Sequence, residues 1–194
     1  MLHLAQDTDP GWFERIRDSL DTILVDHCHL EKRAASNALN LIFRYTGCEG
    51  IPRELSEVVR EEMEHFTQVL DILDARGIEF TRLPPSPYAT ALQAELRKNE
   101  PGAFLDKLLM AGFIEARSCE RFKILSQGLA EDEPELAAFY RELMIAEARH
   151  HLLYTNIARR FYSDSVVKAR LKELAPAEVA ALKAAGEVPR LHSW

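Results

Sequence analysis

The fold of this chain is decided by a four-residue pattern that occurs twice, as Glu62-Met63-Glu64-His65 and as Glu147-Ala148-Arg149-His150. Side chains three residues apart lie on one face of a helix, so the glutamate and the histidine of each stretch point in the same direction. Apolar residues recur on that face at alternating steps of three and four, as in a helix that faces the interior of a bundle. Each stretch therefore predicts a long helix whose buried face has a glutamate and a histidine at its middle.

Two further apolar stripes lie upstream, and each has one glutamate at its middle. Glu31 stands 31 residues before Glu62, and Glu115 stands 32 residues before Glu147. The chain thus contains an internal duplication, in which each half supplies a helix with one glutamate and then a helix with Glu-x-x-His. Four such helices predict a four-helix bundle.

Carboxylates that face one apolar core are unfavourable unless positive charge compensates them, because burial disfavours the charged form and like charges repel. No lysine or arginine occupies the six positions, so metal ions are the natural source of that charge. Four carboxylates and two imidazoles suit a pair of first-row metal ions, and we expect iron, with manganese as an alternative. The predicted metal ligands, which are also the predicted catalytic residues, are Glu31, Glu62, His65, Glu115, Glu147 and His150.

The composition is typical of an all-α protein. The chain has 194 residues, of which 47% are hydrophobic and 28% are charged, and only 8 are glycine. Ala, Leu, Glu and Arg, which favour helices, recur throughout, whereas runs of β-branched residues are almost absent. The length fits one domain with its own hydrophobic core.

Glycine and proline residues set the expected boundaries of the helices. We expect core helices at about 10–46, 52–76, 102–128 and 134–161, and a C-terminal extension over 162–194. Additional short helices are expected near 88–97 and after Pro176. The segment 81–87 contains three prolines and is expected to be irregular. All of residues 1–194 are expected to form a single domain.

The sequence also predicts a cytoplasmic location. The three cysteines, Cys28, Cys48 and Cys119, form no CxxC pair and leave an odd thiol, which favours a reducing compartment. No apolar run is long enough to cross a bilayer, and the N-terminal residues lack the layout of a signal peptide. We therefore expect no membrane partner.

Four segments carry a resemblance to one known family. They are 26–35, 60–66, 147–151 and 114–122, the last of which contains the most specific run, Glu-Ala-Arg-Ser-Cys-Glu-Arg-Phe from Glu115 to Phe122. The chain resembles the bacterial tRNA 2-methylthio-N6-isopentenyladenosine hydroxylase family, within the ferritin-like di-iron superfamily. The resemblance extends over essentially the whole chain and includes all six predicted ligands.

The resemblance implies a ferritin-like four-helix bundle with additional short helices, in a single di-iron domain. It implies a monooxygenase that hydroxylates the isopentenyl group of a hypermodified adenosine next to the tRNA anticodon. Two iron ions, as Fe2+ or Fe3+, would be the cofactors, and O2 would be the co-substrate. Electrons would come from a separate electron-transfer protein, because the chain has no sequence for a flavin, ferredoxin or rubredoxin module.

A tRNA partner requires phosphate contacts from basic residues, yet the formal net charge is −7. Two local clusters offer such contacts, and the alternative interpretation of both is a solvated helix face. The predicted tRNA-binding residues are Arg159, Arg160, Lys168, Arg170 and Lys172 in one cluster, and Arg117 and Arg121 in the other.

Other functions and other residues near the ligands stay open at this point. The alternative functions are an iron-storage or peroxide-scavenging ferritin-like protein, a di-iron hydroxylase of another small apolar substrate, and a zinc-holding bundle without redox turnover. His27 lies one turn before Glu31 and is expected to be a hydrogen-bonded core histidine or a support for that ligand. His151 lies about 100° around the helix from His150 and is expected to be a surface residue or a support for a ligand. Cys119 is expected to be a small buried apolar residue.

Overall fold

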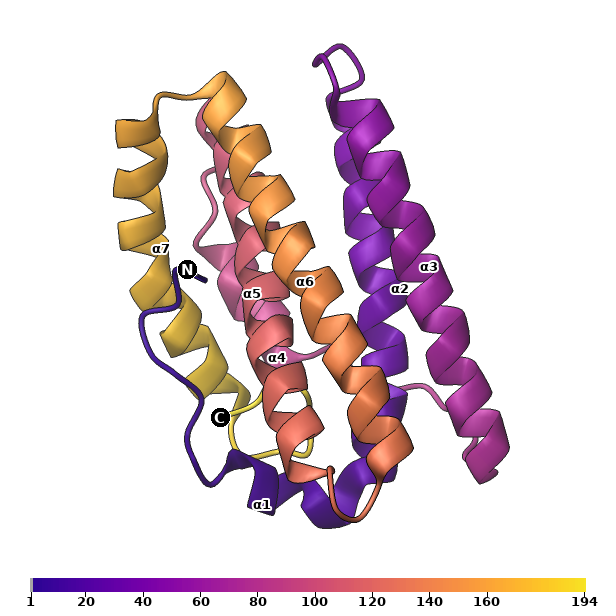
Figure 1. Cartoon of the computed structure of the whole chain (residues 1–194). Helices are drawn as coiled ribbons and strands as arrows, with labels where there is room; N and C mark the ends of the chain where they lie inside the picture. The colour runs from indigo at the N-terminus through magenta and orange to yellow at the C-terminus, as the bar shows by residue number, and fades with distance from the viewer. Residues whose placement is uncertain (1) are drawn as a thin grey trace. The chain divides into compact units, whose positions relative to one another are not determined.

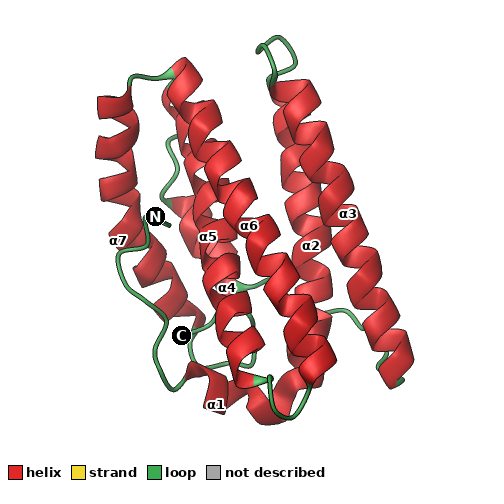
Figure 2. Ribbon diagram, in the orientation of Figure 1, coloured by secondary structure: helices red, strands yellow, loops and turns green. Residues whose placement is uncertain are grey.

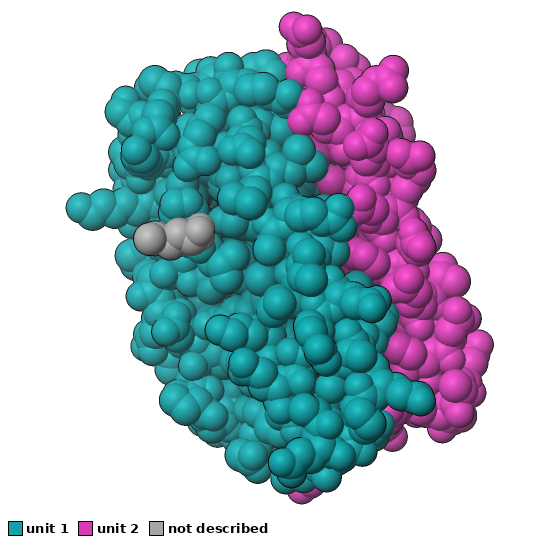
Figure 3. Space-filling view, in the orientation of Figure 1, with its two compact units in different colours: residues 1–17, 85–194 teal, residues 18–84 magenta. Residues whose placement is uncertain are grey.

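The computed structural model describes residues 2–194, and over that range the chain consists of helices and loops without a strand (Figure 2). The prediction of an all-α protein is confirmed. Two compact units can be distinguished (Figure 3). We call residues 18–84 the hairpin unit, and residues 2–17 together with 85–194 the main unit. The prediction of a single domain over 1–194 stays a prediction.

The hairpin unit contains two long helices, α2 (Leu20–Arg44) and α3 (Ile51–Arg76), which pack side by side (Figure 1). α3 has Pro52 in its first turn, where the missing N–H costs no helical hydrogen bond, and ends at Gly77, whose φ of +66° suits a residue without a Cβ. The residues that follow, 78–86, are not helical, as predicted for most of the proline-rich segment 81–87. The exception is Pro87, which is the first residue of the next helix. The hairpin presents a buried face that includes Glu31 and Glu62.

The main unit is built on a second pair of long helices, α5 (Gly102–Gly128) and α6 (Pro134–Phe161), which also pack side by side (Figure 1). Their bounds agree with those expected from the sequence. The residues that recur at steps of three and four around the predicted ligands are all buried: Leu105, Leu108, Gly112, Glu115, Cys119 and Phe122 on α5, and Tyr140, Leu143, Glu147, His150, Tyr154 and Ile157 on α6. The spacing of apolar residues at alternating steps of three and four therefore predicted the buried face of both helices correctly.

The remaining helices of the main unit differ from the expectation at the C-terminal end. α4 (Pro87–Ala94) packs against α7 (Asp164–Ala185) around Tyr88 and Leu182. The prediction of a short helix that starts after Pro176 is wrong, because α7 begins at Asp164 and continues through this proline. Pro176 lies on the exposed side of α7, while residues on both sides of it along the chain are buried, so packing outweighs the one hydrogen bond that proline removes.

The expected helix over 10–46 is also interrupted. The chain forms α1 (Trp12–Ile16) and a 3₁₀ turn over Arg17–Ser19 before α2 begins at Leu20. Trp12 and Ile16 are buried within the main unit, and the guanidinium of Arg121 lies 4.2 Å from the centre of a Trp12 ring. Trp12 and Ile16 thus pack in the main unit, and the 3₁₀ turn separates α1 from α2. Over residues 2–194, no helix combines the length and the apolar character that a membrane span requires.

Candidate metal centre

The hairpin unit brings three potential metal ligands together. Glu31 lies on α2, and Glu62 and His65 lie on the facing side of α3. One ligand atom from each residue lies within 4.8 Å of the other two. Nδ1 of His65 is 3.6 Å from Oε2 of Glu31 and 3.8 Å from Oε2 of Glu62. The hairpin unit therefore holds two carboxylates and one imidazole at a spacing that a single metal ion can bridge.

His27 orients one of these carboxylates. Its Nε2 atom donates a hydrogen bond to Oε1 of Glu31 at 2.5 Å, and the side chain is fully buried. The two oxygens of Glu31 therefore have different surroundings, because Oε1 accepts from His27 while Oε2 faces His65. A buried donor behind a carboxylate fixes its orientation, which is a common support for a metal ligand.

The electrostatics of the hairpin unit favour a cation at this position. Burial alone would lower the pKa of His65, but its contacts with Glu31 and Glu62 and the charges of these carboxylates outweigh burial and raise that pKa to about 10. The two carboxylates thus create a field that holds positive charge on the imidazole. A metal ion would supply that charge in place of the proton.

The main unit holds a matching set of three ligands. Glu115 lies on α5, and Glu147 and His150 lie on α6, where Nδ1 of His150 is 3.8 Å from Oε2 of Glu147. One ligand atom from each of the three lies within 4.8 Å of the other two. All three side chains are buried. The two units thus present the same donor set, which is the outcome expected of the internal duplication.

Two neighbours of the main-unit ligands have other roles. His151 turns away from His150, and its Nδ1 donates a hydrogen bond to the backbone oxygen of Gly112 at 2.7 Å. Burial, together with the charges of Glu147 and Glu120, raises the pKa of the Cys119 thiol to about 11. Cys119 is therefore a buried neutral thiol, in agreement with the expectation of a small buried apolar residue.

The donor set fits iron. Oxygen-rich sites with one imidazole per metal ion suit first-row metals that change oxidation state, whereas thiolate-preferring ions need cysteine. Glutamate and Glu-x-x-His on paired helices are the ligand pattern of dinuclear carboxylate bundles. The residues present in each unit therefore match one half of such a site.

The predicted tRNA-binding residues of the first cluster lie at the end of α6 and on α7. Arg159 and Lys168 both pair with Asp164, at 3.2 Å and 2.6 Å. Arg170 pairs with the buried Asp106 at 2.8 Å and with Glu173 at 2.9 Å. Arg160 and Lys172 are exposed. This cluster is on the surface, but acidic neighbours compensate part of its charge.

The predicted tRNA contacts of Arg117 and Arg121 are wrong, because both side chains are buried. Arg117 binds Glu178 and Glu120, and it also donates to the backbone oxygen of Gln6. Arg121 donates to the backbone oxygen of Ser193 at 2.5 Å. Burial and the nearby Arg117 charge lower the pKa of Arg121 to about 9. Local sequence does not show that these side chains are buried, because the segments that cover them come from both ends of the chain.

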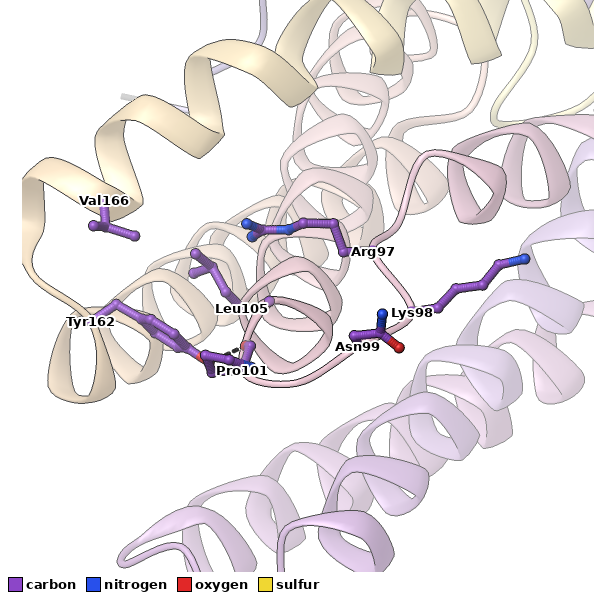
Figure 4. Close-up of a pocket in the computed structure, with 8 residues that line it drawn as sticks. Arg97, Lys98, Asn99, Pro101, Leu105, Tyr162 and Val166 are labelled. Carbon is purple, nitrogen blue, oxygen red and sulfur yellow. Dashed lines mark hydrogen bonds between the residues drawn. The ribbon is translucent and has the colours of Figure 1, made fainter.

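Two basic residues in the turn before α5 were not among the predicted site residues. Arg97 and Lys98 line a pocket with Tyr162 at the start of the turn between α6 and α7 (Figure 4). The only sequence signal was a short run, Arg-Lys-Asn, that precedes Pro101. The aromatic residue stands more than sixty positions later, so no local pattern could connect the three.

Comparisons with known proteins agree with this geometry. A solved structure described as "Protein 43 with aldehyde deformylating oxygenase activity from Synechococcus" matches with a TM-score of 0.93 and 40% identity, over 98% of this chain and 95% of that one. This likeness confirms the predicted fold class, all-α and ferritin-like.

Two curated relatives have the name tRNA 2-(methylsulfanyl)-N(6)-isopentenyladenosine(37) hydroxylase. The protein from Pseudomonas putida is 37% identical over 191 residues, which are 98% of this chain and 91% of the relative. The protein from Salmonella typhimurium is 35% identical over 136 residues, which are 70% of this chain and 49% of the relative. The family model described as tRNA-(MS[2]IO[6]A)-hydroxylase (MiaE) matches residues 1–193. The predicted resemblance is confirmed, and this chain belongs to the tRNA-(MS[2]IO[6]A)-hydroxylase family.

Proposed function

We propose that this chain is a di-iron monooxygenase that hydroxylates the isopentenyl group of 2-(methylsulfanyl)-N6-isopentenyladenosine next to the tRNA anticodon. The observation that carries this proposal is the family match over residues 1–193, together with 37% identity to a curated hydroxylase across 98% of the chain. The two sets of carboxylates and imidazole support it independently, because they provide a place for a redox metal.

We further propose that the six predicted residues bind two iron ions, with one imidazole on each. His65 and His150 would be the nitrogen ligands, and Glu31, Glu62, Glu115 and Glu147 would bridge or cap the ions. The equal donor sets of the two units support this assignment. When bound, the iron pair supplies the oxidising chemistry, using O2 as co-substrate and electrons from a separate electron-transfer protein.

The protein's own residues orient the ligands and keep water away from them. His27 holds Oε1 of Glu31 through its hydrogen bond, which leaves Oε2 on the side of His65. On α6, Leu143 precedes Glu147 by one turn and Tyr154 follows His150 by one turn, and both are buried. These buried neighbours, one turn away on either side, keep water from the ligands of the main unit.

The direct test is mass spectrometry of nucleosides from isopentenylated, methylthiolated tRNA after incubation with iron-loaded protein, a chemical reductant and air. We expect the hypermodified adenosine to gain one oxygen atom. Metal-free protein and tRNA without the isopentenyl group are the controls, and neither should give this product. Absence of the oxygen gain with about two irons bound per chain would overturn the tRNA hydroxylase assignment.

A second candidate function is oxygenation of a small apolar aldehyde. The solved structure that is 40% identical is described as a protein "with aldehyde deformylating oxygenase activity". Incubation of the same iron-loaded protein with a medium-chain aldehyde, reductant and air tests this candidate. Release of formate with no oxygen gain on tRNA would favour it over the tRNA hydroxylase.

A further inference from the structure

A pocket of about 480 Å³ lies within the main unit, between the turn that precedes α5 and the turn that joins α6 to α7. Its lining includes Arg97, Lys98, Asn99, Pro101, Tyr162 and Val166 (Figure 4). The lining contains two cations and no acidic residue. This combination of positive charge, an amide and an aromatic ring is unlike the apolar surroundings of the proposed ligands.

The Tyr162 ring is held in place at the edge of the pocket. Its hydroxyl donates a hydrogen bond to the backbone oxygen of Pro101 at 2.5 Å, and its ring centre is 6.2 Å from that of Phe104. Figure 4 shows the ring beside Pro101, with Val166 on the neighbouring helix. Val166 is 46% exposed. A fixed ring next to an exposed apolar side chain offers a platform for a flat, partly apolar group.

The Arg97 guanidinium is anchored on one edge only. Its Nε and Nη2 atoms donate to the carboxylate of Asp106, and Nη1 takes no part in these bonds. The side chain remains 47% exposed. Asp106 also binds Arg170, which pairs with Glu173 as well, so the charges of these four side chains balance. The net positive charge of the pocket lining therefore comes from Lys98. The exposed edge of the Arg97 guanidinium and the ammonium group of Lys98 suit a phosphate group.

The pocket is separate from the proposed ligands of the same unit. Leu105, which lines it, lies ten residues before Glu115 on α5, a distance of about 15 Å along the helix. An adenosine at the ligands therefore cannot also occupy the pocket. At about 3.4 Å per stacked nucleotide, the separation corresponds to several positions along an RNA strand.

We propose that this pocket binds a single-stranded nucleotide of the tRNA, a few positions from the adenosine that is modified, with its base on Tyr162 and its phosphate at Arg97 and Lys98. The inference rests on the proposed function. Protein domains that bind unpaired RNA combine a positively charged groove with aromatic rings on which bases stack. The Asn99 amide can donate to or accept from a base edge.

The test measures the affinity of the iron-loaded chain for a labelled anticodon stem-loop that carries the hypermodified adenosine, at several salt concentrations. Tyr162→Leu removes the ring and should weaken binding about tenfold. Tyr162→Phe is the matched variant, because it loses the hydrogen bond to Pro101 and keeps the ring, and it should bind within about twofold of the wild type. Lys98→Ala should lower the slope of log affinity against log salt by about one.

Arg53→Ala is the control for loss of one positive charge, because Arg53 is exposed on α3 in the hairpin unit. It should leave both the affinity and the salt slope unchanged. If Tyr162→Leu and Lys98→Ala bind the stem-loop like the wild type while the wild type hydroxylates tRNA, the pocket assignment is wrong and the proposed function stands. A wild type that neither binds nor hydroxylates the RNA would overturn both. Weaker reduction by a partner protein with unchanged RNA affinity would identify a protein-docking site and also overturn the pocket assignment.

Discussion

The guanidinium of Arg117 and the carboxylate of Glu178 form a two-point ion pair inside the main unit. Nε of Arg117 is 2.9 Å from Oε1 of Glu178, and Nη2 is 2.7 Å from Oε2. Neither side chain is exposed to solvent. Tyr88 donates a further hydrogen bond to Oε1 of Glu178 at 3.1 Å. The pair therefore joins α5, α7 and α4 two residues along the chain from the proposed ligand Glu115.

Substitution of Glu178 by alanine should destabilise the fold strongly. It would leave the buried Arg117 guanidinium without its bidentate partner, a change that costs about 3–5 kcal/mol in other buried ion pairs. Urea unfolding followed by circular dichroism measures the change in the free energy of unfolding. Glu173→Ala is the matched control, since Glu173 pairs with Arg170 but is 63% exposed, and it should cost at most about 1 kcal/mol. Equal effects of the two substitutions would contradict the structural role of the buried pair.

Removal of a proposed ligand should abolish turnover while the helices persist. For Glu115→Ala or His150→Ala we expect hydroxylation to fall by more than about 100-fold, since even residues that only support metal ligands contribute about 10- to 100-fold. Iron content per chain should fall in parallel, and far-ultraviolet circular dichroism should change little. Glu64→Ala is the control, because Glu64 lies between Glu62 and His65 in sequence but is exposed. Wild-type iron content in His150→Ala would remove this residue from the ligand set.

Loss of the His27 imidazole should weaken metal binding without removing a ligand. His27→Ala takes away the donor that holds Oε1 of Glu31, and we expect iron affinity to fall about 10- to 100-fold. Titration of metal-free protein with ferrous iron under anaerobic conditions provides the measurement. His29→Ala is the control, because His29 Nε2 donates instead to the backbone oxygen of Thr81 at 2.8 Å. If both variants bind iron equally well, His27 does not support Glu31.

Asp106 should make the stability depend on pH in acid. Burial alone would raise its pKa, but hydrogen bonds from Arg170 and Arg97 outweigh burial and lower that pKa from 3.8 to about 2. The unfolded chain therefore takes up this proton at a higher pH than the folded chain. The resulting stabilisation, about 2 kcal/mol, is present above pH 3.8 and is lost as the pH falls towards 2.

Urea unfolding at a series of pH values between about 5 and 2.5 tests this dependence. Asp106→Asn should show a smaller decrease in stability over this range than the wild type, and it should already be less stable at neutral pH. Asp21→Asn, at an exposed position at the start of α2, should retain the wild-type dependence. If the stability of Asp106→Asn decreased in acid as much as that of the wild type, the folded protein would not lower the pKa of Asp106.

The sequence by itself determined the long helices and the proposed ligands. Apolar residues at steps of three and four identify the buried face of a helix wherever the stripe is long, which is why the sequence predicted the buried faces of α5 and α6. The Glu-x-x-His spacing places Glu62 with His65, and Glu147 with His150, on one helical face through the helical repeat alone. Both properties depend only on the geometry of one helix. Family membership followed from the same residues and their neighbours.

Only the tertiary structure decided which segments cover each face. Arg117 and Arg121 lie on α5 and were predicted to contact RNA, but Glu178 and Ser193, from the far end of the chain, bury and bind them. Pro176 was expected to precede a helix, yet α7 continues through it because residues on both sides of this proline are buried. The pocket of Arg97 and Tyr162 likewise joins residues that no local pattern connects. Helix periodicity records the side of a helix that is buried, whereas the partner on that side depends on contacts between distant segments, which no local pattern contains.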